Sequence, residues 1–434
     1  MERFLKKELI QWKNSLERKP LILSGARQVG KTWILKDFAK TEYKDYVYIN
    51  CDNNTFVKSL FRDYDTDRII RTLSAVSGKR IQKNETLVIL DEIQEVPNGL
   101  TALKYFCEDA PEYHIVVAGS LLGIQMHKGT GYPVGKVDKL TLYPLSFDEF
   151  LNALGKEELS AYLKEGRWEE YNYIKDILTE YLRQYFYVGG MPKTVSSYIK
   201  RGDLNEVRSI QNSILKDYEE DFSKHIPENE LPKIQAVWNS IPSQLAKENK
   251  KFIWGVLRKG ARAKEFENAV QWLIQAGLVH KVTRVKNVEA PLKFYEDSQT
   301  FKLFFNDIGL LGAMSGIEAK DVLFDWKMIT EYKGMFTEQY IAQQFWSTLK
   351  ESLFYYTNEN STSEIDFVFY KENLYPVEVK AEENLKSKSL STVLKANKNL
   401  KALRFSMSNY REQEQLTNVP LGLAPWFFKN LDEE

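Results

Sequence analysis

A short glycine-rich segment near the N-terminus places the strongest constraint on how this chain can fold. Residues 24–32 read Ser-Gly-Ala-Arg-Gln-Val-Gly-Lys-Thr and match the pattern G-x-x-x-x-G-K-[ST]. The apolar run 21–23 precedes this segment, and a helical pattern at 33–39 follows it. A strand, a loop and a helix in this order form a phosphate site, because the loop amides and the helix N-terminus face the anion. The segment therefore predicts a P-loop in an α/β domain.

Each position of this loop has an expected role. Gly25 and Gly30 let the loop turn, so that its amides face the phosphates. Lys31 should reach the β- and γ-phosphates, and the Thr32 hydroxyl should ligate magnesium. The alternative, a glycine turn with a chance lysine, is disfavoured by the strand–loop–helix context. ATP and Mg²⁺ are the expected cofactors, and the predicted nucleotide-binding residues are Gly25, Ala26, Arg27, Gln28, Val29, Gly30, Lys31, Thr32 and Asp91.

Two further apolar runs end in polar residues suited to this chemistry. The run 87–90 ends in Asp91 and Glu92, at the edge where ligands of open α/β sheets bind. Asp91 is expected to hold the magnesium, and Glu92 to act as the catalytic base that polarises the attacking water. An acidic solvated loop is the alternative. Ser120, after the run 115–118, is a candidate to contact that water or the γ-phosphate, although a helix N-cap or turn serine explains it nearly as well.

The remaining pattern extends this sheet and adds further segments. Apolar runs at 46–49 and 137–142, separated from the others by helical stretches, predict a parallel sheet covered on both faces. Residues 151–228 are largely helical and rich in tyrosine, which predicts a lid or connector. Helices near 234–241 and 263–275, followed by strand-like runs at 278–285 and 301–305, predict a winged-helix-like module over 229–318.

Composition limits the classes of partner and of compartment. The 434 residues contain 60 Lys and Arg against 60 Asp and Glu, so no net charge attracts nucleic acid over the whole surface. The two cysteines fit a reducing compartment, and the four histidines show no metal-ligand spacing. No apolar run approaches the length of a membrane span, and the first twenty residues lack the apolar core of a signal peptide. We therefore expect a cytoplasmic protein with no membrane contact.

The C-terminal segment, 328–434, contains a second group of polar residues. Glu364 and Asp366 share one face of a predicted strand, and Glu378 and Lys380 share one face of the next strand after a short turn. Carboxylates in this arrangement suit Mg²⁺ or Mn²⁺, and a metal-bound water becomes a nucleophile near neutral pH. The alternative is an ordinary edge hairpin in which Glu378 and Lys380 pair with each other.

These motifs, taken in order, resemble prokaryotic AAA-type P-loop ATPases whose C-terminal region is a domain of unknown function with a restriction-endonuclease-like fold. Besides the P-loop, 90–92 and 118–123, the likeness is carried by 143–150, 187–192, 307–311, 364–366 and 377–380. It implies a P-loop AAA-type ATPase domain at 1–150 and a nuclease-like α/β domain at 328–434. By the same resemblance to the PD-(D/E)xK core, Asp366 and Glu378 would hold metal, Lys380 would orient a water, and Glu338 would be the additional metal-side acid.

The family often has Gly-Arg after the sensor strand, with the arginine as a finger, whereas this chain has Gly135-Lys136. Lysine lacks the guanidinium fork, so activation between subunits is open, and a homo-oligomer is only one possibility. Residues 247–264 contain seven basic side chains with interleaved aromatics, which predicts either DNA contact or a solvated or docking face. Two hypotheses follow: an ATPase that drives a DNA-cleaving C-terminal domain, or an ATP-controlled interaction protein whose C-terminal domain is an inactive binding module.

Overall fold

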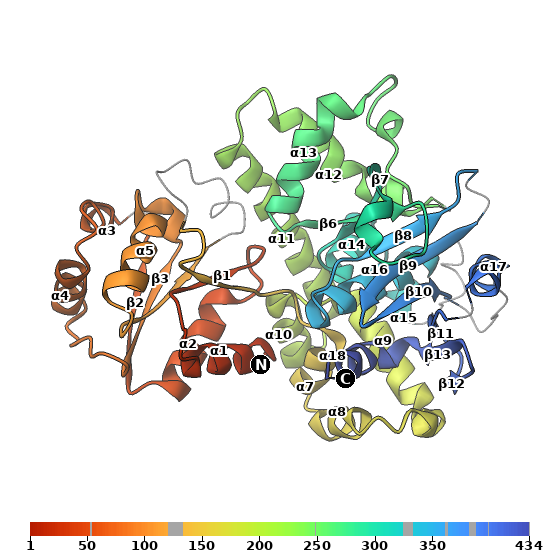
Figure 1. Ribbon diagram of the computed structural model, residues 1–434, viewed down its shortest axis with the longest axis horizontal. Helices are drawn as coiled ribbons and strands as arrows, with labels where there is room; N and C mark the ends of the chain where they lie inside the picture. The colour runs from red at the N-terminus through yellow and green to blue at the C-terminus, as the bar shows by residue number, and fades with distance from the viewer. Residues whose placement is uncertain are drawn as a thin grey trace. The chain divides into compact units, whose positions relative to one another are not determined.

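A computed structural model describes residues 1–52, 54–119, 133–247, 249–323, 333–360, 363–381, 388–397 and 399–433. The chain divides into two compact units, and each is described by itself (Figure 1). The P-loop unit contains Glu2–Tyr143 and Gln275–Gly277, and the C-terminal unit contains Met1, Pro144–Ile274 and Leu278–Glu434. Among the helices of these described ranges, none combines the length and apolar character needed to cross a bilayer.

The P-loop unit is built on a five-stranded sheet in the order β2-β3-β4-β1-β5, and every strand pair is parallel. Its strands are β1 (Leu21–Ser24), β2 (Asp45–Asn50), β3 (Thr86–Asp91), β4 (His114–Ala118) and β5 (Asp138–Thr141). Its helices are α1 (Leu5–Asn14), α2 (Lys31–Glu42), α3 (Thr55–Leu60), α4 (Thr66–Ser77), α5 (Gly99–Asp109) and the short η1 (Ile93–Glu95). The predicted parallel α/β arrangement is confirmed for this unit.

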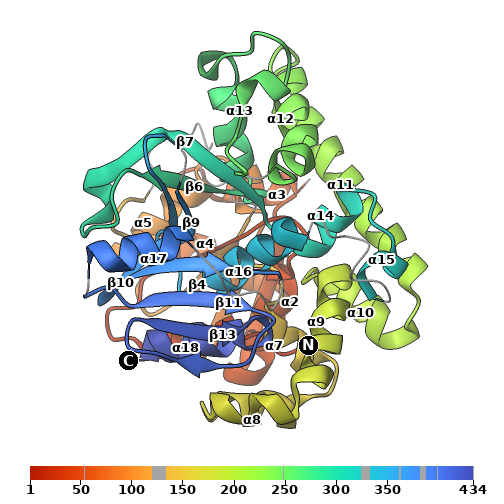
Figure 2. The same cartoon turned by 90° about the vertical axis from the view of Figure 1, so that its right-hand side faces the viewer.

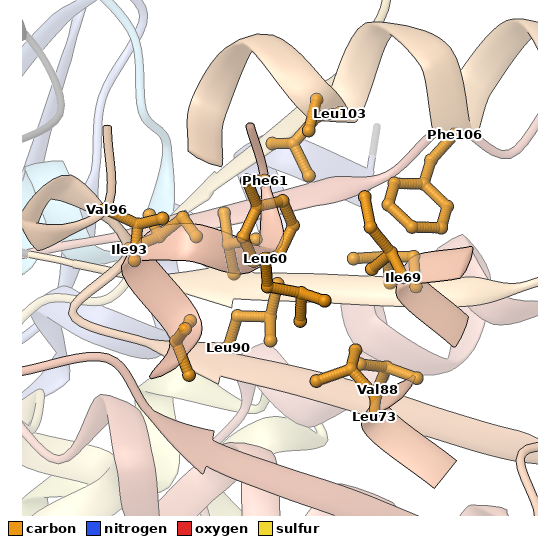
Figure 3. Packing of buried hydrophobic residues seen from close by; sticks show 14 of the residues in the cluster. Leu60, Phe61, Ile69, Leu73, Val88, Leu90, Ile93, Val96, Leu103 and Phe106 are labelled. Atoms are coloured by element: carbon orange, nitrogen blue, oxygen red, sulfur yellow. The ribbon is translucent and has the colours of Figure 1, made fainter. Parts of the chain in front are cut away.

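One face of this sheet carries a closed apolar core. Figure 3 shows Ile69 of α4 and Phe106 of α5 packed with Val88 of β3, all of them fully buried. Burial of β3 and β4 on both faces explains their continuous apolar sequences, which parallel strands between helices require. Because each large side chain buried here contributes about 1.5–3 kcal/mol, this core fixes the ends of the strands that position the polar residues.

The C-terminal unit contains an eight-stranded mixed sheet in the order β12-β13-β11-β10-β9-β8-β6-β7. Its strands are β6 (Val279–Val285), β7 (Glu296–Phe305), β8 (Phe354–Thr357), β9 (Glu364–Lys371), β10 (Asn373–Val379), β11 (Ala402–Ser406), β12 (Arg411–Glu412) and β13 (Leu416–Pro420). The hairpin β6–β7 was expected as a separate wing. Instead, β6 pairs in parallel with β8, so the hairpin is one end of the common sheet.

Helices surround this sheet, and α16 lies against its face (Figure 2). The helices are α7 (Phe147–Ala153), α8 (Glu157–Lys164), α9 (Lys175–Val188), α10 (Pro192–Arg201), α11 (Leu204–His225), α12 (Leu231–Leu245), α13 (Ala263–Gln275), α14 (Ile308–Met314), α15 (Ala319–Leu323), α16 (Lys333–Thr348), α17 (Lys388–Ala396) and α18 (Ala424–Glu433). Short η turns occur at Trp168–Tyr173, Trp254–Val256, Leu292–Tyr295 and Leu421–Leu423.

Helix α16 is buried on nearly all sides, and its glutamines satisfy backbone groups that would otherwise lack partners. Gln339 accepts from the Phe305 amide at 2.9 Å and donates to the Phe305 carbonyl at 2.7 Å. Gln343 accepts from the amide of Ile308, and Gln344 from that of Phe147. A single helix therefore joins the end of β7 to the starts of α14 and α7.

Candidate functional site

The predicted loop runs between β1 and α2, and its backbone requires glycine. Gly25 has φ 150°, and a Cβ there would lie 2.4 Å from the Leu142 carbonyl oxygen. Gly30, the residue before α2, has φ 98°, and Gln28 also has a positive φ of 66°. Any larger residue at position 25 would collide with backbone, so the first glycine of the motif is fixed by close approach rather than by flexibility alone.

The Lys31 ammonium lies inside this loop. Its Nζ donates to the carbonyl oxygens of Gly25 and Ala26, each at 2.9 Å, and the residue is buried. Burial lowers the pKa of Lys31 to about 8. Both of its hydrogen-bond partners are neutral, so an anion that enters the loop would replace weak partners with strong ones.

Asp91 stands at the end of β3, beside the start of α2. Its Oδ2 accepts from the Thr32 hydroxyl at 2.6 Å and from the Tyr48 hydroxyl at 3.0 Å. Burial, with Asp91 next in effect, raises the pKa of Tyr48. Sequence reasoning missed Tyr48. The signal was available in the parallel strand pattern, since Tyr48 lies two residues before the end of β2, and β2 pairs with β3.

Glu92 follows β3 in a left-handed conformation, with φ 55° and ψ 44°. A non-glycine residue there costs on the order of 1–3 kcal/mol and occurs most often at functional sites. The Glu92 amide donates to Asp91 Oδ1 at 3.2 Å, and the Gln94 amide group donates to the Glu92 carboxylate. The strand end thus presents two carboxylates with different partners. Ser120, the third predicted residue of this site, lies outside the described residues.

In the C-terminal unit, the carboxyl groups of Asp366 and Glu378 lie on neighbouring strands. Asp366 Oδ2 accepts from the Val379 amide at 2.7 Å. Burial, with Glu338 next in effect, raises the pKa of Asp366 to about 7. Lys380 Nζ lies 2.7 Å from Glu378 Oε1, whereas the buried Glu378 Oε2 has no hydrogen-bond partner among the described residues. Strand β10 is internal, between β9 and β11, so the edge position of the alternative is wrong, whereas its Glu378–Lys380 pair is present.

Both carboxylate oxygens of Glu338, on α16, lie near ammonium groups. Its Oε1 lies 2.7 Å from Lys250 Nζ, and its Oε2 lies 3.6 Å from Lys302 Nζ. Lys302 also pairs with Glu364, at 2.6 Å. Burial acts to raise the pKa of Glu338, but the two ammonium groups hold it below its ordinary value. We call Lys250, Lys302, Glu338 and Glu364 the ionic cluster.

The expected metal site at Glu338, Asp366 and Glu378 is therefore poorly matched by the geometry. Within the described ranges, no group of three or more His, Cys, Asp or Glu side chains is placed to hold a metal ion. Magnesium needs several oxygens near 2.0–2.1 Å, and both Glu338 oxygens already face ammonium groups. The residues present do not fit a divalent cation at Glu338, while metal binding by Asp366 and Glu378 stays a prediction.

Comparison with protein families identifies three consecutive segments. Residues 17–151 match the model of an AAA domain. This match agrees with the geometry of the glycine loop and of the end of β3, and together they identify the kind of domain that the first segment forms. Residues 17–151 form an AAA-type P-loop domain. Residues 179–321 match Domain of unknown function (DUF8612), and residues 333–423 match Domain of unknown function (DUF4143).

Solved structures similar to this chain include the Walker-type ATPase of Pyrococcus abyssi, at 15% identity, 72% coverage of this chain, 95% of that chain and a TM-score of 0.44. The Aeropyrum pernix ORC1 protein in complex with DNA matches at 12% identity, over 73% of this chain and 93% of that chain, with a TM-score of 0.30. Cdc6p from Pyrobaculum aerophilum matches at 12% identity, over 74% and 95%, with a TM-score of 0.28. No curated protein matches.

The residues of the AAA domain fit a nucleoside triphosphate with Mg²⁺. Lys31 is already directed into the loop, and a bound phosphate can replace the two neutral carbonyl oxygens as its partner. Thr32 and Asp91 contribute a hydroxyl and a carboxylate, which are oxygen ligands of the kind that Mg²⁺ prefers. Glu92 lies one residue beyond them, where a base for an attacking water is required.

Lys136 and Arg201, two cations that could act as a finger on the phosphates of another subunit, each pair with an acid of their own unit. Lys136 of the P-loop unit pairs with Glu108 at 2.9 Å, and that contact raises the pKa of Lys136. Arg201 of the C-terminal unit pairs with Glu206 at 2.8 Å. Exposed ion pairs of this kind are weak, so either cation could leave its partner. The pairs therefore do not decide whether a cation of one subunit acts on the phosphates of another.

Two of the ordered motifs meet at one buried carboxylate. Asp307 Oδ2 accepts from the Gly190 amide at 2.6 Å, and Oδ1 accepts from the Leu310 amide at 3.0 Å. A Cβ on Gly189 would lie 2.3 Å from Asp307 Oδ1. Burial raises the pKa of Asp307 to about 6. The motifs 187–192 and 307–311 are thus a structural junction of the C-terminal unit.

The basic stretch 247–264 divides into two kinds of side chain. Lys251, Lys259 and Arg262 are exposed, as a nucleic-acid contact requires. Lys250 is buried in the ionic cluster, so its expected role as a phosphate contact is wrong. Arg258 is exposed and pairs with Glu265. The exposed side chains alone leave DNA contact open.

Proposed function

We propose that this protein is a Mg²⁺-dependent ATPase whose nucleotide state controls the C-terminal unit. The observation that carries the proposal is the position of Lys31, buried in the P-loop on neutral carbonyl partners, close to the Thr32–Asp91 contact. A lysine in that position is ready to exchange its partners for phosphate oxygens. A structural lysine would instead be paired with a carboxylate.

Each residue of the site has a separate task in this proposal. The loop amides and Lys31 bind the phosphates and stabilise charge that develops on them during hydrolysis. Thr32 and Asp91 would hold Mg²⁺. The bound ion would neutralise part of the phosphate charge. Glu92 orients the attacking water and accepts its proton. Tyr48 fixes the orientation of the Asp91 carboxylate through its hydrogen bond.

The experiment is steady-state ATP hydrolysis combined with nucleotide binding. Lys31→Ala is expected to lose turnover and to bind ATP more weakly, because it removes a phosphate contact. Glu92→Gln is expected to keep binding and to lose turnover by roughly 100-fold or more, because it removes only the base. Glu95→Gln, an acid in the same η1 turn, is the matched control. Normal turnover in Glu92→Gln would show that the base has been assigned to the wrong residue.

For the C-terminal unit, we propose a binding role rather than metal-dependent cleavage. The lysines of the ionic cluster support this choice, because they already neutralise the carboxylate that the nuclease hypothesis gives to metal. Incubation of linear, circular and single-stranded DNA with Mg²⁺ or Mn²⁺, with and without ATP, tests it. Cutting that disappears in Lys380→Ala would establish the nuclease at Asp366, Glu378 and Lys380.

DNA is the proposed partner, supported by the exposed basic side chains of 247–264. Neutralising Lys251, Arg258 and Arg262 to glutamine is expected to abolish stimulation of ATP hydrolysis by DNA and to flatten its salt dependence. Changing Lys264 alone is the milder comparison. A response to DNA that is flat at every salt concentration would instead favour a signalling ATPase that does not bind DNA.

A further inference from the structure

The ionic cluster draws its members from separate parts of the C-terminal unit. Glu338 lies on α16, Glu364 on β9 and Lys302 on β7, while Lys250 lies in the segment after α12. The two oxygens of Glu338 each face a different ammonium group, at 2.7 and 3.6 Å. Lysines of the segment that matches one family model therefore neutralise acids of the segment that matches the next.

Both lysines are fixed in place by their surroundings. The Lys302 side chain is 0% exposed, projects from within β7 and lies over the Tyr355 ring at 4.8 Å. The Lys250 side chain is 9% exposed, and its segment is tied to the sheet by the Phe252 amide, which donates to the Phe301 carbonyl at 2.8 Å. Neither ammonium belongs to an exposed side chain that is free to swing away.

These ammonium groups neutralise Glu338 and so compete with a metal: Oε1 accepts a hydrogen bond from Lys250, and Oε2 lies 3.6 Å from Lys302 without a hydrogen bond. A divalent cation bound to Glu338 would lie within a few ångströms of two ammonium groups in a buried site, where like charges repel strongly. Removing the lysines from the carboxylate would leave buried charges without partners, which is unfavourable. Occupation by lysine and occupation by metal are therefore mutually exclusive at this carboxylate.

We propose that Lys250 and Lys302 occupy the place of a divalent cation, so that the nuclease-like centre is a metal-free ionic junction that holds the two family segments together. This inference goes beyond the proposed ATP hydrolysis and is independent of it, because it concerns only how the carboxylate of Glu338 is neutralised. Asp366 and Glu378 lie near Lys380, as the nuclease pattern requires. Glu338, the additional acid of that pattern, instead binds lysine side chains of the same chain.

The test is thermal unfolding without nucleotide in the presence of EDTA or millimolar Mn²⁺. All proteins carry Asp91→Asn, which removes the carboxylate proposed to hold Mg²⁺ in the P-loop unit. The otherwise unchanged chain is expected to show no shift with Mn²⁺. Lys250→Met should unfold roughly 5–10 °C lower, because it leaves Glu338 short of a partner, and Mn²⁺ should restore part of that loss. Lys250→Met with Glu338→Gln should recover most of it without metal, and Lys251→Met should not shift.

A Mn²⁺-dependent rise in the unfolding temperature of the chain with both lysines, abolished by Asp366→Asn, would overturn the proposal. If Lys250→Met fails to fold, electron paramagnetic resonance of Mn²⁺ added to the Asp91→Asn protein measures whether the C-terminal unit binds the ion. No bound ion supports the ionic junction, and one tightly bound ion refutes it. ATP turnover of the native chain is measured separately, so failure of the ATPase proposal and failure of this one are distinguishable.

Discussion

The two units each bury lysine ammonium groups, and the partners of those groups differ. Lys31 in the P-loop unit donates to two backbone carbonyl oxygens, whereas Lys302 in the C-terminal unit faces the carboxylates of Glu338 and Glu364. The acids follow the same division. Asp91 is bonded to the Thr32 and Tyr48 hydroxyls, while Glu338 is bonded to ammonium groups.

This difference teaches how to tell a site prepared for a ligand from a site closed by the protein itself. Charged groups with neutral partners keep most of their capacity to bind a phosphate or a cation, because the new contact is the stronger one. Charged groups with charged partners have lost that capacity, and separating them leaves an unpaired buried charge. Both sites contain lysines and acids. The hydrogen-bond and ion-pair partners of these residues therefore decide whether a site can bind a ligand.

The largest expected effect tests this contrast directly by comparing two lysine-to-methionine changes. Lys302→Met should lower the free energy of unfolding by about 3–5 kcal/mol, because the partly buried Glu364 loses its pair and the buried Glu338 keeps only Lys250. Lys31→Met should lower it by less, because the lost hydrogen bonds end on neutral carbonyl oxygens, so that no buried carboxylate is left without its hydrogen-bonded ion pair. Denaturant unfolding of the nucleotide-free proteins measures both. Equal losses in the two variants would remove the distinction between the sites.

Much of the P-loop unit was predictable because its signals are local. The glycine loop, the β3 strand ending in Asp91 and the helix after Lys31 are contiguous in sequence, and each appears in the structure within a few residues of its expected bounds. Tyr48 was missed because its contact with Asp91 joins strands whose neighbours in the sheet must first be known.

The C-terminal unit was harder because its decisive contacts are distant in sequence. Strands were predicted at 364–370 and 375–380 and occur at Glu364–Lys371 and Asn373–Val379, but the Lys250–Glu338 pair joins residues 88 positions apart. A lysine in a basic stretch has the same sequence signature whether it points to solvent or to a buried carboxylate. The hairpin β6–β7 has the sequence pattern of a wing whether or not it pairs with another strand. Its parallel pairing with β8 becomes visible only in the folded structure.

The next effect concerns pH, and it involves the buried His114 of the P-loop unit and the partly buried His280 of the C-terminal unit. Burial lowers the pKa of both His114 and His280 to about 4, from an ordinary value of 6.5. The unfolded chain therefore takes up protons that the folded chain excludes. Stability contributed by the neutral rings is present above pH 6.5 and is lost progressively as pH falls toward 4. For His280, which is partly buried and stacks on Trp346, the loss is up to about 3 kcal/mol.

Unfolding measured between pH 7 and pH 4.5 checks this expectation. His280→Gln should be less stable than the native chain at pH 7 and should show a flatter decline toward acid. His114→Gln is the corresponding change in the P-loop unit, where the ring contacts the Tyr43 hydroxyl at 2.7 Å. If the native chain and both variants decline in parallel, histidine is not the source of the acid sensitivity.

The smallest expected effect returns to the partners of Asp91. Tyr48→Phe removes one hydrogen bond from a hydroxyl to the Asp91 carboxylate, which is worth roughly 1.5 kcal/mol, and leaves the Thr32 contact in place. Since Asp91 then loses its fixed orientation, the Mg²⁺ concentration for half-maximal ATP hydrolysis should rise several-fold, while turnover at saturating Mg²⁺ changes little. Tyr46→Phe, two residues earlier on β2, is the matched control. A fall in turnover with no change in Mg²⁺ dependence would contradict this role. Tyr48 would then act on the phosphates of ATP, and its hydroxyl would join Lys31 and the loop amides as a group that binds the nucleotide.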